Sequence, residues 1–190
     1  MKYLIPAMVL AITGQSLAAP STLRYIKRVA IPGTTCSGDP GQQGVIDAIN
    51  KWNSDVVTVN NFLEAAPTLS PPALLFQIET ALTSAQDEPV ELAVLACESD
   101  VTDGTAAQNA VNDLAAGFEN NVLTPLGNII ANAGDATAVA SNLQTINQFR
   151  CCNVLPDLDV LWSFTAEDEG VANQVPLSAP RPSTCAAITC

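Results

Sequence analysis

The sequence predicts an all-α protein, an up-down helical bundle of four to six helices, stapled by disulfides and followed by an extended, proline-rich carboxyl-terminal tail. Two observations carry this prediction. Apolar residues recur at alternating steps of three and four along most of the chain, which is the spacing of one helix face, and no stretch alternates with the period of two that is typical of strands. Proline, serine, aspartate and glycine stand where these runs begin and end, as helix boundaries require.

The chain begins with the features of an exported protein. A short apolar run, 3–12, leads to the small residues Ser16-Leu17-Ala18, so residues 1–18 are predicted to be a secretory signal peptide that is cut after Ala18. Residues 19–28 end in the dibasic pair Lys27-Arg28 and are predicted to be a pro-segment, the alternative being a flexible basic amino terminus. No stretch is apolar over the roughly 20 residues that a membrane span needs, so no transmembrane segment is expected.

Charge is distributed unevenly along the chain. Of the 7 basic and 19 acidic residues, all the acidic ones but only Lys51, Arg150 and Arg181 follow Arg28, which gives the trimmed chain a formal charge of −16. Such a surface repels phosphate backbones and anionic lipid headgroups. Nucleic acid and acidic membranes are therefore not expected as partners.

The first long helix is expected between Asp39 and Ala66. Asp39 is predicted to cap it, with Pro40 in its first position and Gln42 in capping-box register, and Pro67 is predicted to end it. Its apolar face steps by four and three through a single row of residues. That row consists of Val45, Ile49, Trp52, Val56, Val59 and Leu63.

The second helix is expected to open at Ser70-Pro71-Pro72 in the same manner. The predicted buried row comprises Leu75, Ile78, Leu82, Ala85, Leu92, Leu95 and Ala96. Because the row continues past Pro89, the sequence favours one helix that is kinked at this proline, the alternative being a fresh helix that starts there.

Two further helical segments complete the predicted bundle. A turn at 100–105 is followed by a helix to about Ala133 with a bend at Pro125, and Gly134 and Asp135 are predicted to stop it and to cap the next helix. The predicted buried positions are Ala107, Val111, Leu114, Phe118, Val122, Leu126, Ile129, Ile130, Val139, Leu143, Ile146 and Phe149. That next helix is expected to run out at Cys151-Cys152, and a last one to cover about 153–167. The bundle domain is thus predicted over 29–169, with the tail at 170–190.

Six cysteines in an exported chain predict three disulfides among 15 possible connectivities. Adjacent cysteines rarely bridge each other, because consecutive Cα atoms lie about 3.8 Å apart and a disulfide needs about 5.5 Å. If the helices run antiparallel, most of the cysteines gather at one end of the bundle. We then expect Cys36 and Cys97 to pair with Cys151 and Cys152 in some order, and Cys185 and Cys190 to pair together or one each with that cluster. No CxxC pair and no histidine are present, so no metal site is predicted.

The sequence offers little catalytic chemistry, and the protein is not expected to be an enzyme or to carry a cofactor. Without histidine, neither a Ser-His-Asp nor a Cys-His arrangement can be built. The carboxylate groups Asp157 with Asp159, Glu167-Asp168-Glu169 and Asp87-Glu88 could supply an acid and a base, but they are more typical of solvated helix ends. Five aromatic residues are expected in the core rather than on a sugar platform, namely Trp52, Phe62, Phe118, Phe149 and Trp162.

The segment from Glu98 to Gly104 carries three acidic residues and invites comparison with a calcium loop. It does not match an EF-hand, because Asp103 occupies the sixth place counted from Glu98, and Val111 occupies the last place counted from Asp100. Weak calcium binding at its surface remains open.

Several short sequence motifs together resemble those of a group of small secreted helical proteins of filamentous fungi. They are Gln86-Asp87-Glu88-Pro89, Arg150-Cys151-Cys152-Asn153-Val154-Leu155-Pro156 and the Pro180-Arg181-Pro182 tail that leads to Cys185. The long helices rich in Ala, Asn and Val are also similar, more distantly, to the fungal hydrophobic surface-binding and cell-wall galactomannoprotein group. That likeness implies a helical bundle that associates with cell walls, hydrophobic surfaces or lipids. The six cysteines distinguish this chain from the second group.

Two non-enzymatic functions follow as expectations. The first is a secreted interaction protein, extracellular or associated with the cell wall, whose partner is an extracellular protein or a cell-wall polysaccharide. The second is a carrier that holds an apolar ligand, a fatty acid or a sterol, within the helical bundle. The many alanines of the predicted rows are compatible with such a cavity, and equally with close helix packing.

Overall fold

The computed structural model describes residues 36–190, which contain helices, turns and coil but no β-strand. The α-helices are α1 (Gly41–Ala65), α2 (Pro71–Leu95), α3 (Ala106–Phe118), α4 (Thr124–Ala131), α5 (Ala136–Phe149) and α6 (Leu155–Asp168). Two π-helical segments, η2 (Glu119–Leu123) and η3 (Arg150–Val154), join α3 to α4 and α5 to α6. Two 3-10 segments, η1 (Ala66–Thr68) and η4 (Ser183–Ala187), lie outside the long helices. The all-α prediction is confirmed. The predicted signal peptide, the pro-segment and their cleavage residues Ala18, Lys27 and Arg28 lie outside the described residues.

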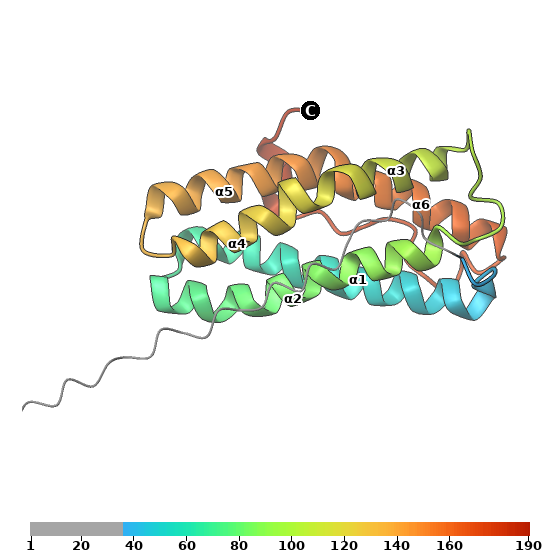
Figure 1. Ribbon diagram of the computed structural model, residues 1–190, viewed down its shortest axis with the longest axis horizontal. Coiled ribbons are helices and arrows are strands. Elements are labelled where there is room, and N and C mark those ends of the chain that lie inside the picture. Colours follow the sequence, from blue (N-terminus) through green and yellow to red (C-terminus); the bar gives the residue numbers. More distant parts are fainter. Residues whose placement is uncertain (1–35) are drawn as a thin grey trace, which may run out of the picture.

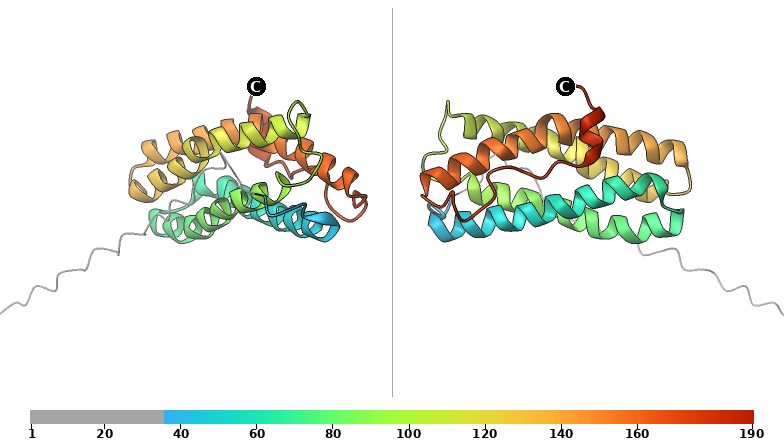
Figure 2. Two further views of the ribbon diagram at one scale, coloured as in Figure 1. Left: turned by 45° about the vertical axis from the view of Figure 1, so that its right-hand side comes forward. Right: turned by 180° about the vertical axis from the view of Figure 1, so that it is seen from behind.

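The helices run up and down along the length of the molecule (Figure 1). α1 and α2 form one antiparallel pair, and the joined helices α3-α4 and α5-α6 form a second pair that packs against it (Figure 2). The connections 66–70 and 132–135 lie at one end, which we call the turn end. The start of α1, the loop 96–105 and the end of α6 lie at the other end, which we call the acidic end.

The predicted apolar row of α1 is the centre of the core. All six of its residues are at most 1% exposed, and Trp52 meets Trp162 of α6 edge to face with 6.2 Å between ring centroids. Burial of such large side chains contributes most of the favourable free energy of folding. The expectation that the aromatic residues belong to the core is confirmed for Trp52, Phe62, Phe118 and Trp162, and Phe149 is partly buried against it.

The predicted burial of one residue in the α2 row, Leu75, is wrong. Leu75 is 39% exposed, whereas its neighbour Leu74 is 2% exposed and continues the row that leads to Ile78. The row steps back from Ile78 by four residues rather than three, and either step is compatible with helical periodicity, so spacing alone could not decide between the two leucines.

The beginning of α1 also differs in detail from the prediction. The helix starts at Gly41, and Asp39 accepts a hydrogen bond from the Gly41 amide at 2.7 Å, one position earlier than a standard cap would act. Gln42 does not complete a capping box. Its side chain instead donates to the backbone oxygen of Glu169 at 2.9 Å, which ties the start of α1 to the end of α6.

The expected helix break at Cys151-Cys152 is wrong. The chain continues through the widened turn η3 from α5 into α6, and η2 bridges α3 and α4 in the same way. Each π-helical segment directly precedes a proline near the start of the next helix, Pro125 in α4 and Pro156 in α6. A proline lacks the amide proton and crowds the carbonyl four residues before it, and a wider turn accommodates both effects. α2 runs through Pro89 as one helix, as the sequence favoured.

The structure contains the three expected disulfides. The predicted pairing of Cys36 and Cys97 with Cys151 and Cys152 is wrong, whereas the alternative in which Cys185 and Cys190 pair one each with the cluster is confirmed. Cys36 pairs with Cys97 at the acidic end, and the adjacent cysteines Cys151 and Cys152 pair with Cys185 and Cys190 of the tail. The two adjacent cysteines do not bridge each other, as expected. Because α5 continues through η3 into α6, Cys151 and Cys152 lie halfway along the bundle. They are therefore distant from Cys36 and Cys97, which lie at the acidic end.

The tail returns from the acidic end along the side of the bundle (Figure 1). Its backbone is held by side chains of three helices: Asp159 accepts from the Ala179 amide at 2.7 Å, Asn60 donates to the Pro180 oxygen at 2.8 Å, and Gln148 donates to the Thr189 oxygen at 3.1 Å. Together with two disulfides, these contacts order a segment that would otherwise be a loose terminus. Among the described residues, no helix combines the length and apolar character needed to cross a bilayer.

Candidate functional site

A mainly apolar groove of about 780 Å³ lies near the turn end, and we call it the tail groove. One wall comes from α5, another from the turn between α1 and α2 with the start of α2, and the third from the last residues of the tail. Its lining residues are Ala66, Pro67, Leu69, Pro71, Leu74, Ala133, Gly134, Ala136, Val139, Ala140, Leu143, Gln144, Asn147, Gln148, Thr184, Ala187, Ile188 and Thr189.

Local sequence explains why the walls stand where they do. Asp135 caps α5 by accepting from the amides of Thr137 and Ala138, which fixes the direction in which the helix leaves the turn end. The disulfides of Cys151 and Cys152 then fasten the tail to the same helical segment. The groove is therefore bounded by two helix ends and by a tail that two disulfides hold in place.

Polar groups are few in the tail groove, and none is charged. Two side-chain oxygens in its lining, Oδ1 of Asn147 and Oγ1 of Thr184, are buried and have no hydrogen-bond partner among the described residues. Buried polar atoms are usually paired, because an unpaired one forfeits its hydration. A mostly apolar and uncharged recess is suited to an apolar ligand.

A second polar group lies inside the bundle. Glu88 of α2 accepts from Nη1 of Arg150 at 2.9 Å and from Nε1 of Trp52 at 3.1 Å, and Asn60 accepts from Nη2 of Arg150 at 3.4 Å. Burial raises the pKa of Glu88, and the Arg150 guanidinium opposes that rise. Arg150 and Glu88 are each at most 1% exposed, so the group is enclosed by the core and serves the fold rather than a substrate.

The carboxylates that the sequence offered as an acid and a base lie outside the tail groove. Asp159 binds Arg181 at 2.5 Å, and Asp87 lies 3.4 Å from Lys51. Asp157 is half-buried beside Asp113, and burial raises its pKa to about 6. None of these residues lines the tail groove, whose residues carry no carboxylate.

Sequence reasoning missed the Arg150 and Glu88 pair, although a signal was present. Glu88 follows Ala85 by three residues and Arg150 follows Ile146 by four, so both occupy positions of the apolar rows. Two opposite charges on buried rows predict a buried ion pair. No comparable signal announces the tail groove, because its third wall is the tail and the position of the tail depends on the disulfide pairing.

Comparison with known proteins adds no residues to this site. The chain matches no family model, no curated protein and no solved structure. The resemblance to secreted fungal helical proteins therefore stays an expectation.

Proposed function

We propose that this chain is a secreted, non-enzymatic binding protein that holds an apolar ligand of the size of a sterol or a fatty acid in the tail groove. The observation that carries the proposal is the groove itself, with about 780 Å³ of uncharged, mainly apolar space. Ligand sites in proteins are typically of this size and composition. The carrier hypothesis thereby gains support over the other one, with its site moved from the interior of the bundle to its side.

The charges of the protein favour a neutral polar end on the ligand. Lys51, Arg150 and Arg181 are the cationic side chains of the described residues, and each pairs with a carboxylate outside the groove. A fatty-acid carboxylate would therefore meet no cation in the groove and would face a strongly acidic protein. A neutral sterol or fatty alcohol should therefore bind more tightly than a fatty acid.

The test is a titration of the delipidated protein with a fluorescent sterol and with a fluorescent fatty acid. We expect saturable binding of one sterol per chain. Ala140→Trp places an indole in the groove from an exposed helix position and should weaken binding at least tenfold. Ala116→Trp is the matched control, because Ala116 is also an exposed helical alanine but does not line the groove.

Two results would refute the carrier. One is the absence of saturable binding for both probes, and the other is equal binding by the Ala140→Trp and Ala116→Trp proteins. Native mass spectrometry of the secreted protein, followed by solvent extraction, provides an independent check. A stoichiometric apolar adduct is expected on the wild type and should be lost from Ala140→Trp.

A second candidate function is a secreted interaction protein that contacts a cell wall or a hydrophobic surface. The observation that favours it is the exposure of Leu75 and Phe76 on α2, at 39% and 79%, just beyond the groove residue Leu74. An exposed phenylalanine beside an exposed leucine is a natural contact for an apolar partner. Retention on chitin, glucan or an alkyl resin should fall for Phe76→Ser and persist for Val160→Ser, and equal retention of the two variants argues against it.

A further inference from the structure

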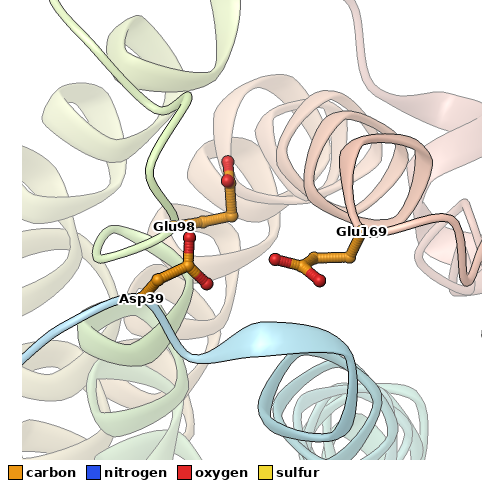
Figure 3. Close-up of side chains that lie close together, drawn as sticks. All are labelled: Asp39, Glu98 and Glu169. Atoms are coloured by element: carbon orange, nitrogen blue, oxygen red, sulfur yellow. The ribbon is translucent and has the colours of Figure 1, made fainter.

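Five carboxylates from three distant parts of the chain converge at the acidic end. Asp39 precedes α1, Glu98 and Asp100 follow α2, and Asp168 and Glu169 close α6. Oxygens of Asp39, Glu98 and Glu169 lie within 4.8 Å of one another, and so do oxygens of Glu98, Asp100 and Asp168. Figure 3 shows the first of these groups, in which three separate segments bring their side chains to one place. Glu98 belongs to both groups and is their common member.

Glu98 is also the member whose environment most needs a cation. Its side chain is only 2% exposed, although glutamate is almost never buried without a partner. Oε1 accepts from Ser99 Oγ at 3.2 Å and from the Asp100 amide at 3.1 Å, whereas Oε2 is buried without a hydrogen-bond partner among the described residues. Burial of an ionised carboxylate without a countercharge is costly, so Oε2 marks the place of a positively charged ligand.

No cationic side chain of the described part of the chain can neutralise this cluster. Lys51 pairs with Asp55 and Asp87, Arg150 with Glu88, and Arg181 with Asp159. All of these pairs lie elsewhere, so none of the described cationic side chains supplies a countercharge at the acidic end.

Backbone electrostatics add to the negative potential. α2 ends at Leu95 and α6 at Asp168, so two helix carboxyl termini, each with a partial negative charge, lie near the cluster, against one helix amino terminus, that of α1. A bound cation would offset the mutual repulsion of carboxylates that lie this close together.

We propose that the acidic end binds a calcium ion, with Glu98 as the central ligand and with Asp39, Asp100, Asp168 and Glu169 around it. All the available donors are oxygens, since the chain has no histidine and its six cysteines form disulfides. Calcium takes six to eight oxygen ligands in flexible geometry, with carboxylates that bind through one oxygen or both. Magnesium demands a strict octahedron and keeps several waters, which a loose ring of five carboxylates serves less well.

The fold holds these carboxylates in place before any ion arrives. The Cys36–Cys97 disulfide joins the segment of Asp39 to the residue before Glu98, and the Ser99 amide donates to Asp39 Oδ2 at 3.1 Å. Gln42 holds the backbone of Glu169 against α1. Calcium would therefore tie together the start of α1, the end of α2 and the end of α6, and it should stabilise the whole bundle.

The test is thermal unfolding of protein freed of metal by chelation, at pH 7.5 in 150 mM sodium chloride, with increasing calcium chloride. Extracellular calcium modules bind with Kd values of about 10⁻⁴ to 10⁻³ M. A hundredfold excess over Kd should raise Tm by roughly 5 to 10 °C for a chain of this length. Glu98→Gln keeps the shape of the side chain and removes its charge, so it should abolish this rise while leaving Tm without calcium unchanged or higher.

Asp103→Asn is the matched control, because Asp103 is an exposed carboxylate of the same loop that belongs to neither group. It should keep the full rise in Tm, which separates binding from general screening of an acidic protein. Asp168→Asn, at an exposed position, serves as a second variant if Glu98→Gln folds poorly, and isothermal titration should show its calcium affinity reduced at least tenfold. The proposal is overturned if the wild type shows no rise, or if the variants of Glu98 and Asp168 respond as Asp103→Asn does. Either result leaves the sterol titration unaffected, because the tail groove lies at the turn end.

Discussion

Arg150 and Glu88 form an ion pair in the interior of the bundle, with Nη1 2.9 Å from Oε1, although 62 residues separate them in the chain. Glu88 comes from α2, and Arg150 from the widened turn between α5 and α6. Trp52 and Asn60 of α1 complete the group, and Asn60 also donates to the tail at Pro180. One buried polar group thus links both helix pairs and the carboxyl-terminal tail.

Removal of one partner of this pair should be far more harmful than removal of both. Glu88→Gln leaves the guanidinium buried without its counterion and should lower the free energy of unfolding by about 3 to 5 kcal/mol. The double variant Glu88→Leu with Arg150→Met should recover most of that loss, because it leaves no isolated charge. Urea denaturation followed by the emission of the buried tryptophans measures both effects.

The exposed pair of Arg181 and Asp159 provides the comparison for this prediction. Arg181→Met should cost about 1 kcal/mol or less, as is usual for surface pairs. If Glu88→Gln costs no more than Arg181→Met, the buried pair does not stabilise the bundle in the way described.

The two tail disulfides close loops that overlap almost completely, which predicts that loss of one of them costs less than loss of the Cys36–Cys97 bond. With Cys151–Cys185 intact, the bond of Cys152 to Cys190 closes only a short additional loop, so its loss should cost about 2 kcal/mol in the chain-entropy picture. The Cys36–Cys97 bond spans 61 residues, and its loss should cost about 4 kcal/mol. Paired serine variants compared by urea denaturation test this order, and a larger loss for Cys152 with Cys190 would contradict it.

The raised pKa of Glu91 predicts that this residue makes the protein more stable in mildly acidic than in alkaline solution. Burial raises its pKa from 4.5 to about 7, so the folded chain binds more protons than the unfolded chain between these values. The contribution of Glu91 to the free energy of unfolding is fully present below about pH 4.5. It is lost as the pH rises through 7, and the loss is roughly 3 kcal/mol at most.

Glu91→Gln isolates this contribution from those of the other carboxyl groups. The variant should be more stable than the wild type at pH 8, and the difference should disappear or reverse near pH 4.5. Glu79→Gln, at an exposed position of the same helix, should change stability little at either pH. A wild type that gains stability between pH 5 and pH 8 relative to Glu91→Gln would refute the assignment.

Replacement by alanine is expected to have different effects on stability at two helical glycines, Gly117 and Gly127. A Cβ on Gly117 of α3 would lie 2.3 Å from the ring of Phe149, whereas a Cβ on Gly127 of α4 would meet no atom within 4 Å. Gly127→Ala should therefore raise the free energy of unfolding by about 0.5 to 1 kcal/mol. Gly117→Ala must displace a partly buried ring and should be the less stable of the two. Thermal unfolding compares them directly, and an equal gain from both would show that Phe149 yields without cost.

Helix positions were readable from the sequence because they depend on local chemistry. The six apolar positions of α1 and the cap at Asp135 follow from spacing and from hydrogen-bonding groups that lie a few residues apart. The choice between Leu74 and Leu75 was not readable, because both fit helical spacing and only the facing helices select one.

The sequence by itself determined that the fold is all-α and that six cysteines can form three disulfides. The tertiary structure decided which cysteines pair. The decisive feature was the continuity of the chain through η3, since a π-helical turn before Pro156 keeps Cys151 and Cys152 halfway along the bundle. That position directs the tail onto α5 and creates the tail groove. The carboxylate cluster around Glu98 likewise exists only once three helix ends have met. Local order follows from neighbours in the sequence, but sites made by distant segments depend on how the helices pack.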